Sequence, residues 1–152
     1  MRAVVTRVRH ASVAIDGAVR GQIGQGFLIL LGITHEDTEA LALKLADKIC
    51  SLRIFEDENG KMNVGLAEAG GELLVISQFT LMANYRHGNR PDFMASAKPD
   101  EANRLYEYFM SLAKKEIRRV EAGVFGAHME VSLMNDGPVT IVMDSEVLKS
   151  KK

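Results

Sequence analysis

ELLVISQFTL, the stretch from Glu72 to Leu81, decides how the rest of the chain is arranged. Its first half, LLVI, is a continuous apolar run, which is typical of a strand buried on both faces of a sheet. Its second half becomes polar at Ser77, Gln78 and Thr80, where we expect the strand to end. Polar groups at a strand end must be hydrogen-bonded, solvated or used on a ligand. This end is therefore either a site or a plain polar strand end.

Further strands are predicted on both sides of this stretch. FLILLGI, residues 27–33, is also apolar throughout, which predicts a second buried strand. Residues 3–9 alternate as in a half-exposed strand, with Arg7 and Arg9 on one face. Asp16-Gly17 is a two-residue hairpin signal that should pair residues 12–15 with residues 18–22. Strand patterns recur at residues 54–55, 61–66, 128–134 and 139–143.

Two amphipathic helices are predicted. The first covers residues 38–52, because Leu41, Leu45 and Ile49 recur at helical spacing after a capping Asp37 or Thr38. The second opens at Pro99, and its apolar face is expected to hold the side chains Leu105, Tyr108, Phe109 and Leu112. The order of elements predicts an α/β domain whose helices gather on one side of a sheet.

The length of 152 residues fits one domain. We expect this domain to span residues 1–145, followed by a basic, frayed tail at residues 146–152 that begins near Ser145. Lys plus Arg total 19 and Asp plus Glu total 20, so the net charge of −1 gives no global attraction to nucleic acid or to an anionic membrane. The single Cys50 and the lack of a leader or a long apolar run predict a cytoplasmic protein without a membrane partner.

Most cofactor chemistry lacks a sequence signal. The four histidines are scattered without the spacing of metal ligands, so we expect no metal. Glycine-rich phosphate loops are absent, so we expect no nucleotide cofactor. Basic runs occur at residues 7–10, 86–90 and 114–119, but each one alone is typical of a solvated face. Only clustering of these runs in three dimensions would indicate a nucleic-acid site.

Two polar motifs remain as candidates, and each has a structural alternative. Residues 77–80, SQFT, could supply a hydroxyl nucleophile or backbone N–H groups that hold an oxyanion, although no partner base is visible. Residues 135–138, NDGP, could equally be a plain turn, because Asp-Gly-Pro ends a strand well. We therefore expect separate strands on either side of NDGP. The residues alone leave hydrolysis open.

Several motifs together carry a resemblance that no single one would support. They are SQFTL at 77–81, NRPDF at 89–93, GVFGAHMEVSL at 123–133 and NDGPVT at 135–140, with MRAVVTRV and ASV near the start. In this order and spacing the chain closely resembles the D-aminoacyl-tRNA deacylase family of the D-Tyr-tRNA deacylase type. The match runs from Met1 to about Asp144.

The resemblance implies a fold, a reaction and partners. The fold would be a single three-layer α/β/β domain with mixed sheets and two main helices. The reaction would be hydrolysis of the ester between a D-amino acid and the 3′-terminal adenosine of tRNA, and tRNA mischarged with glycine would also be a substrate. The protein would act as a homodimer with its active site at the subunit interface, without a cofactor and without DNA as a partner.

The resemblance also implies which residues form the site. A catalytic set would line the pocket for the aminoacyl-adenosine: Ser77, Gln78, Phe79 and Thr80. A second set would select chirality: Gly137, Pro138, Met129 and Asn135. The Gly137-Pro138 bond would be cis and would reach into the pocket of the partner subunit. An L side chain would then clash, whereas a D side chain would point to solvent.

Two reaction schemes are compatible with these residues. In one, the Thr80 hydroxyl attacks the ester. In the other, which we favour because no general base is visible, the ribose 2′-hydroxyl of the tRNA activates water while the N–H groups of Phe79 and Thr80 hold the oxyanion. The alternative from another class is a non-catalytic module of the same fold that binds a tRNA end or a small ligand.

Overall fold

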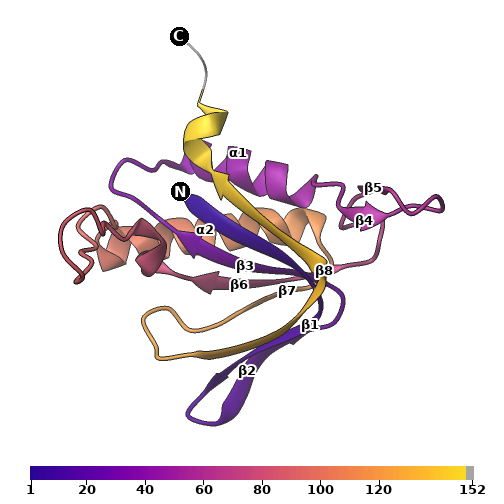
Figure 1. Ribbon diagram of the computed structural model, residues 1–152, viewed down its shortest axis with the longest axis horizontal. Coiled ribbons are helices and arrows are strands. Elements are labelled where there is room, and N and C mark those ends of the chain that lie inside the picture. Colours follow the sequence, from indigo (N-terminus) through magenta and orange to yellow (C-terminus); the bar gives the residue numbers. More distant parts are fainter. Residues whose placement is uncertain (150–152) are drawn as a thin grey trace.

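The computed structural model describes residues 1–149 and forms one mixed α/β domain (Figure 1). Its main sheet has the order β2-β1-β3-β6-β7, and β8 pairs with β1 outside this path. β6 runs parallel to β3 and β7, and the remaining pairs are antiparallel. The six strands are β1 (Arg2–Ile15), β2 (Ala18–Ile23), β3 (Gly26–Gly32), β6 (Glu72–Ser77), β7 (Val120–Ala122) and β8 (Glu130–Asp144). The predicted mixed sheet is confirmed.

Both predicted helices are present, and they cover one face of the sheet (Figure 1). α1 (Glu39–Cys50) begins where the Thr38 hydroxyl accepts a hydrogen bond from the Leu41 N–H at 3.3 Å. α2 (Pro99–Glu116) starts with a proline, whose missing N–H costs nothing in the first turn. A separate two-stranded sheet, β4 (Phe55–Glu56) with β5 (Met62–Val64), projects at one end.

The strands β3 and β6 are buried on both faces, as their apolar sequences predict. Alternate side chains enter two different cores because successive residues of a strand point to opposite faces. One core lies under the helices and contains Phe27, Ile29, Leu31, Leu73 and Val75. The other lies on the far face of the sheet and contains Leu28, Leu74 and Ile76 together with Val8, Val13 and Ile23.

The third layer is formed by β2 together with the second half of β1 and the first part of β8, where the six-stranded sheet folds over itself. β1 pairs with β3 as far as Val8 and then pairs with β2 from Ala11 onward. Its second half therefore leaves the main sheet and folds beneath it, as Figure 1 shows. The approach is close: a Cβ atom on Gly21 of β2 would lie 2.8 Å from the carbonyl oxygen of Ala122 in β7. This arrangement gives the layer order helices, then β3, β6 and β7 with the first half of β1, then the third layer.

The prediction that a strand ends at NDGP is wrong. β8 runs without interruption from Glu130 to Asp144, and NDGP forms a bulge within it. Thr6 of β1 pairs with Thr140 and Val8 pairs with Asn135, so residues 136–139 all lie opposite Arg7. These extra residues bulge out of the pairing between β1 and β8, which continues on both sides of them. The Arg7 side chain holds the bulge by donating a hydrogen bond to its backbone.

Three further details differ from the sequence prediction. The short β7 was not predicted, and in α2 it is Tyr106 rather than Tyr108 that is buried in the core. Ser145–Leu148, predicted to begin a frayed tail, instead forms the 3₁₀ helix η2, in which Ser145 is buried and its N–H donates to the Met1 carbonyl at 2.9 Å. Residues 150–152 of the predicted tail lie outside the described part. Within residues 1–149, no helix is long and apolar enough to cross a membrane.

Candidate active site

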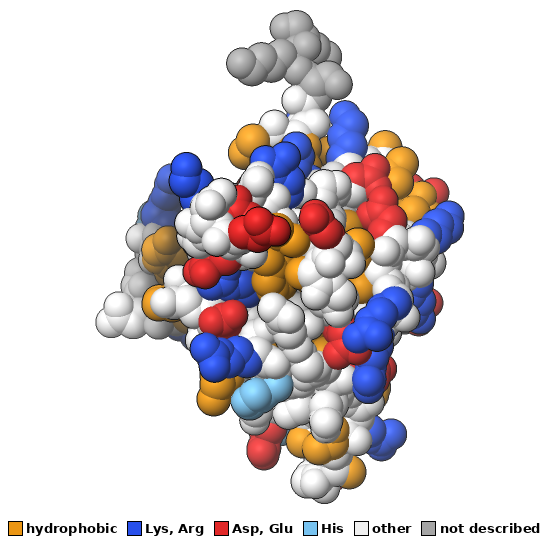
Figure 2. Space-filling model, turned by 90° about the vertical axis from the view of Figure 1, so that its right-hand side faces the viewer, with side chains coloured by type: hydrophobic (Ala, Val, Ile, Leu, Met, Phe, Trp, Pro, Cys, Tyr) orange, Lys and Arg blue, Asp and Glu red, His pale blue; other side chains and the backbone are white. Residues whose placement is uncertain are grey.

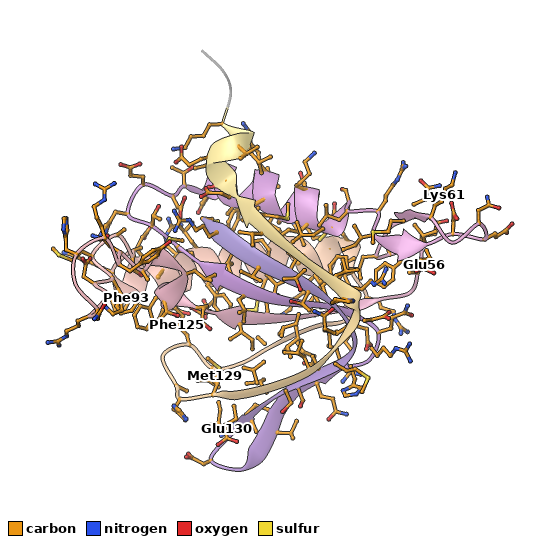
Figure 3. All side chains as sticks on the ribbon, in the orientation of Figure 1. Glu56, Lys61, Phe93, Phe125, Met129 and Glu130 are labelled. Atoms are coloured by element: carbon orange, nitrogen blue, oxygen red, sulfur yellow. The ribbon has the colours of Figure 1, made fainter. Side chains whose placement is uncertain are left out.

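A cavity of about 630 Å³ opens at the end of β6, where the polar stretch begins. One wall is made by the end of β6 and the turn that follows it, and the opposite wall is made by the segment between β7 and β8. Figure 3 labels Phe93, from the loop before α2, and Phe125 and Met129, from the segment between β7 and β8, and all three line the cavity. The remaining lining residues are Leu31, Ile33, Ile76, Ser77, Gln78, Phe79, Ser96, Ala97, Lys98, Pro99, Ala102, Gly126, Ala127, His128 and Val131.

The backbone after β6 presents two unused N–H groups. The Gln78 N–H donates to the Leu31 carbonyl at 2.8 Å and closes the ladder between β6 and β3. The chain then turns into the 3₁₀ helix η1 (Phe79–Met82), whose first backbone hydrogen bond is made by Leu81 to the Gln78 carbonyl at 3.3 Å. Within the described residues, the N–H groups of Phe79 and Thr80 donate to no backbone carbonyl. They are free to bind a negatively charged oxygen.

The side chains of SQFT have different surroundings. Ser77, Gln78 and Phe79 line the cavity, and Thr80 does not. The Gln78 amide donates to the Thr80 hydroxyl oxygen, so this oxygen is already engaged as an acceptor. Phe79 is 56% exposed, and its ring meets the ring of Phe93 edge-on at 5.1 Å. This aromatic pair forms part of the cavity rim.

A buried tyrosine supports both walls of the cavity. The Tyr106 hydroxyl donates to the Val75 carbonyl of β6 at 2.7 Å, two residues before Ser77. Its ring packs at 6.1 Å from Phe125, which lines the opposite wall. Burial raises the pKa of Tyr106 to about 12, so the hydroxyl remains a donor. The sequence offered no motif for Tyr106, although its position three residues before Phe109 of the predicted apolar face was a signal that could have been used.

The cavity carries little ionisable chemistry. Among residues 1–149, no Asp or Glu lines it, and Lys98 and His128 are the only lining side chains that carry or can gain a charge. No group of three His, Cys, Asp or Glu side chains that could hold a metal ion occurs in the described residues. A carboxylate base is thus missing at this position. The walls offer apolar surface, a serine hydroxyl, an amide and backbone N–H groups.

The second predicted set is divided by the structure. Met129 lines the cavity, whereas Asn135, Gly137 and Pro138 lie in the β8 bulge and do not. The Gly137-Pro138 peptide bond is cis. Gly137 and Pro138 are both exposed, so they are available to another molecule. Asn135 holds the bulge closed, with its side-chain oxygen accepting from the Val139 N–H at 2.9 Å.

Arg7 fixes the bulge from inside. Its side chain is almost fully buried, and its Nε donates to the Asp136 carbonyl at 3.0 Å while Nη1 donates to the Ile54 carbonyl at 2.5 Å. Gly137 has a φ of +141°, and a Cβ atom there would lie 2.7 Å from Cγ2 of Val139 and 3.2 Å from Nη2 of Arg7. Only glycine fits this position without displacement of its neighbours.

Comparison with known proteins gives a consistent result. The family described as D-Tyr-tRNA(Tyr) deacylase matches residues 4–144. The D-aminoacyl-tRNA deacylase of Thermus aquaticus is 57% identical over 145 residues, which cover 95% of each chain. The D-aminoacyl-tRNA deacylase of Bacillus velezensis is 55% identical over 146 residues, which cover 96% of this chain and 99% of that protein.

Solved structures agree with the fold. A protein described as c-Myc DNA Unwinding Element Binding Protein is 41% identical and superposes with a TM-score of 0.90, covering 95% of this chain and 98% of that chain. A probable eukaryotic D-amino acid tRNA deacylase is 14% identical with a TM-score of 0.81 and covers 93% and 97% of the two chains, so it supports the fold alone. Between the two classes left open by the sequence, the relatives favour the enzyme over the binding module. The chain belongs to the D-aminoacyl-tRNA deacylase family and is a hydrolase that acts on aminoacyl-tRNA.

Proposed function

We propose that this deacylase cleaves the ester between a D-amino acid and the 3′-terminal adenosine of tRNA in the cavity at the end of β6. The observation that carries the proposal is the pair of free N–H groups on Phe79 and Thr80 beside a cavity without carboxylates. Backbone donors of this kind stabilise the oxyanion that forms when an ester carbonyl is attacked. The cavity of about 630 Å³ falls in the size range of pockets that hold ligands as large as an aminoacyl-adenosine.

The substrate itself supplies the group that activates water. The 2′-hydroxyl of the terminal ribose lies next to the ester and relays protons: it takes a proton from the attacking water as the oxyanion forms and gives its own proton toward the 3′-oxygen. The N–H groups of Phe79 and Thr80 hold this oxyanion. The bond to the 3′-oxygen then breaks, the 3′-oxygen takes the proton, and the products are the free amino acid and tRNA with its 3′-hydroxyl restored. The missing carboxylate supports this scheme.

Thr80 is the less suitable nucleophile. Its side chain is outside the lining of the cavity, and its oxygen accepts a hydrogen bond from Gln78. A serine or threonine nucleophile needs an adjacent general base, and no carboxylate or histidine contacts the Thr80 hydroxyl within the described chain. We therefore assign Thr80 a role through its backbone N–H.

We propose that Gly137 and Pro138 complete the cavity of a second copy of the chain in a homodimer. Both residues are exposed and lie outside the cavity of their own chain. The same strand exposes the large apolar side chains Leu133, Met134 and Val142 on either side of the bulge. Burial of such apolar surface is favourable, and another copy of the chain is the partner that would bring Gly137 and Pro138 to a cavity.

This arrangement selects chirality by exclusion. With Gly137 and Pro138 against the Cα of the bound amino acid, an L side chain would clash, whereas a D side chain would point out of the cavity. Glycine has no side chain to exclude, so tRNA mischarged with glycine would also be hydrolysed. The side chain is not read in detail, so several D-amino acids would be accepted. We also propose a cytoplasmic location, where tRNA is aminoacylated.

The proposal is tested with Pro138→Ala and three substrates: D-aminoacyl-, L-aminoacyl- and glycyl-tRNA. The wild type should hydrolyse the D-aminoacyl and glycyl substrates and spare the L-aminoacyl substrate. Pro138→Ala should raise hydrolysis of the L-aminoacyl substrate by about tenfold or more, with smaller changes for the other two, because the excluding surface is reduced. Val19→Ala, at an exposed apolar residue of β2, is the control and should keep the wild-type preference. Unchanged discrimination in Pro138→Ala would contradict the excluding role.

A further inference from the structure

We infer that residues 85–91, here called the basic tip, bind the phosphate backbone of the tRNA next to its aminoacylated end. The sequence of the tip is YRHGNRP, which contains two arginines and a histidine and no acidic residue. The inference rests on the proposed function, because it assumes that the aminoacylated end of the tRNA is bound in the cavity. The rest of the RNA strand would then continue over the neighbouring surface. It assigns a role to a basic run that the hydrolytic mechanism does not use.

The tip is held closed at its base. Asn84 and Asp92 exchange two backbone hydrogen bonds, of 2.8 and 3.0 Å, and the Asn84 side-chain amide donates to Oδ2 of Asp92 at 3.1 Å. The Arg86 N–H donates to the Asn84 side-chain oxygen at 3.1 Å, and the Met94 N–H donates to Oδ1 of Asp92 at 3.2 Å. We call this set of bonds the clasp. A loop that is ordered before binding loses less conformational entropy when it binds.

The arginines of the tip are free to bind an anion. Arg86 and Arg90 are exposed, and neither forms an ion pair with any residue in the 1–149 range. In contrast, Arg104 of α2 binds Glu39 at 2.7 Å and Glu101 at 2.6 Å. Because arginine matches phosphate with paired N–H donors, two arginines without ion pairs on one short loop form a surface suited to successive phosphates of an RNA backbone.

The tip lies beside the cavity. Its last residue is followed by Asp92 of the clasp and then by Phe93, which lines the cavity and packs against Phe79. In Figure 3, side chains that end in nitrogen extend from the loop beyond Phe93, on the side away from the sheet. Lys98 lines the same cavity and also has no ion-pair partner among the described residues. An RNA strand leaving the cavity on this side would meet successive positive charges.

The chemistry of the tip favours RNA over other polyanions. Tyr85 is 79% exposed at the start of the tip, next to the arginines. An exposed aromatic ring beside cations is the combination that binds single-stranded nucleic acid, because bases stack on the ring while the cations bind the backbone. The end of the molecule that carries β4 and β5 differs, since basic and acidic side chains alternate there (Figure 2).

Binding of uncharged tRNA tests the inference without depending on catalysis. The variant Arg86→Ala/Arg90→Ala should bind about 10- to 25-fold more weakly near 0.1 M salt, because each lost phosphate contact removes about 0.7 from the salt slope of a single strand. The slope of log affinity against log salt should become less steep by roughly 1.4. Arg86→Lys/Arg90→Lys keeps the charges and should retain most of the affinity. Lys48→Ala/Lys61→Ala removes two exposed cations elsewhere, with Lys61 at the far end in Figure 3, and should bind as the wild type does.

Hydrolysis of two substrates shows whether the arginines act on tRNA binding or on the cavity itself. The arginine-to-alanine variant should lose a similar factor in kcat/KM on D-aminoacyl-tRNA and should equal the wild type on the D-aminoacyl ester of adenosine, which has no phosphate for the tip to bind. Equal loss on both substrates would overturn the inference, as would unchanged tRNA binding or an equal loss in the Lys48/Lys61 variant. Preferential, tip-dependent binding of a DNA hairpin of the acceptor sequence would overturn the assignment to RNA. If the wild type hydrolyses neither substrate, the proposed function fails, and the binding experiment still decides the role of the tip.

Discussion

Thr80 is the residue at which the two reaction schemes make opposite predictions. Its hydroxyl oxygen accepts from Gln78 and no base in the described chain contacts it, so we assign the side chain no chemical step. Thr80→Ala should retain deacylation of D-aminoacyl-tRNA to within about tenfold, because one neutral hydrogen bond is worth about 1 kcal/mol. A substrate ending in 2′-deoxyadenosine should lose far more, on the order of a hundredfold or greater, since it lacks the group that activates water. Near-complete loss of kcat in Thr80→Ala, with substrate still bound, would show that the hydroxyl is the nucleophile.

Arg7 has the largest structural role of any single charged side chain at the bulge. It donates to the carbonyls of Asp136 and Ile54, and its side chain is 6% exposed, so its removal leaves buried acceptors without donors. Arg7→Met should lower the free energy of unfolding by about 2 to 4 kcal/mol, measured by urea denaturation. Arg9→Met is a matched control, because Arg9 approaches the same Asp136 at 3.6 Å but is 70% exposed, and it should cost below about 1 kcal/mol. Equal losses in the two variants would contradict this role.

At the scale of the element, β6 positions the site and Tyr106 of α2 holds its end. Tyr106→Phe removes the hydrogen bond to the Val75 carbonyl and should lower the free energy of unfolding by about 1 to 2 kcal/mol. Tyr108→Phe is the control, since no hydrogen bond of the Tyr108 hydroxyl exists in the described structure, and it should change stability by less than about 0.5 kcal/mol.

The pKa of Tyr106 adds a pH signature to the same comparison. Burial, with a smaller effect of Glu107, raises this pKa from 10.0 to about 12. Between these values the unfolded chain has lost the phenol proton and the folded chain has kept it, so the stability contributed by this group falls as pH rises. The fall should be smaller in Tyr106→Phe than in the wild type. An identical pH dependence of the two unfolding curves in this range would contradict the assignment.

Elements whose signal is local could be predicted from the sequence. β3 and β6 follow from continuous apolar runs, and the hairpin follows from Asp16-Gly17, whose φ angles of 50° and 79° suit a two-residue turn. The structure pairs Ile15 with Ala18 and Ala14 with Val19, the register that this turn predicts, and a bulge between Val13 and Ala14 then shifts Ser12 to Gln22. β7 escaped prediction because three residues are too few for a periodicity, and it exists through pairing with β6. The burial of Arg7 escaped prediction because its acceptors at Ile54 and Asp136 are distant in sequence.

For the candidate site as well, only the part with a local sequence signal could be predicted. SQFT ends a strand and changes from apolar to polar within a few residues, so the chain itself marks that wall of the cavity. The opposite wall, with Phe125 and Met129, meets SQFT only through the layered fold. The sequence NDGP is typical of a turn. It forms a bulge because the residues on both sides of it pair with the same strand, β1. Neither relation can be derived from local pattern.

For the whole molecule, we propose that a working site needs two copies of the chain. Each chain holds the cavity at one place and the exposed Gly137 and Pro138 at another, outside the lining of that cavity. If a second copy supplies Gly137 and Pro138, then the cavity of one chain depends on the sequence of the other. A mixed pair, that is, a dimer of two differently substituted chains, distinguishes a role of Gly137 and Pro138 in the partner's cavity from a role within their own chain.

The decisive measurement is the hydrolysis of D- and L-aminoacyl-tRNA by such a mixed pair. One chain carries Ala127→Trp, which fills its cavity, and the other carries Pro138→Ala. The only open cavity then belongs to the Pro138→Ala chain but faces an unaltered Gly137-Pro138 from its partner. The purified pair should discriminate against the L-substrate as the wild type does, while the Pro138→Ala protein alone should not. A mixed pair that hydrolyses the L-substrate as readily as Pro138→Ala alone, or a protein that stays a single chain while discriminating fully, would contradict this proposal.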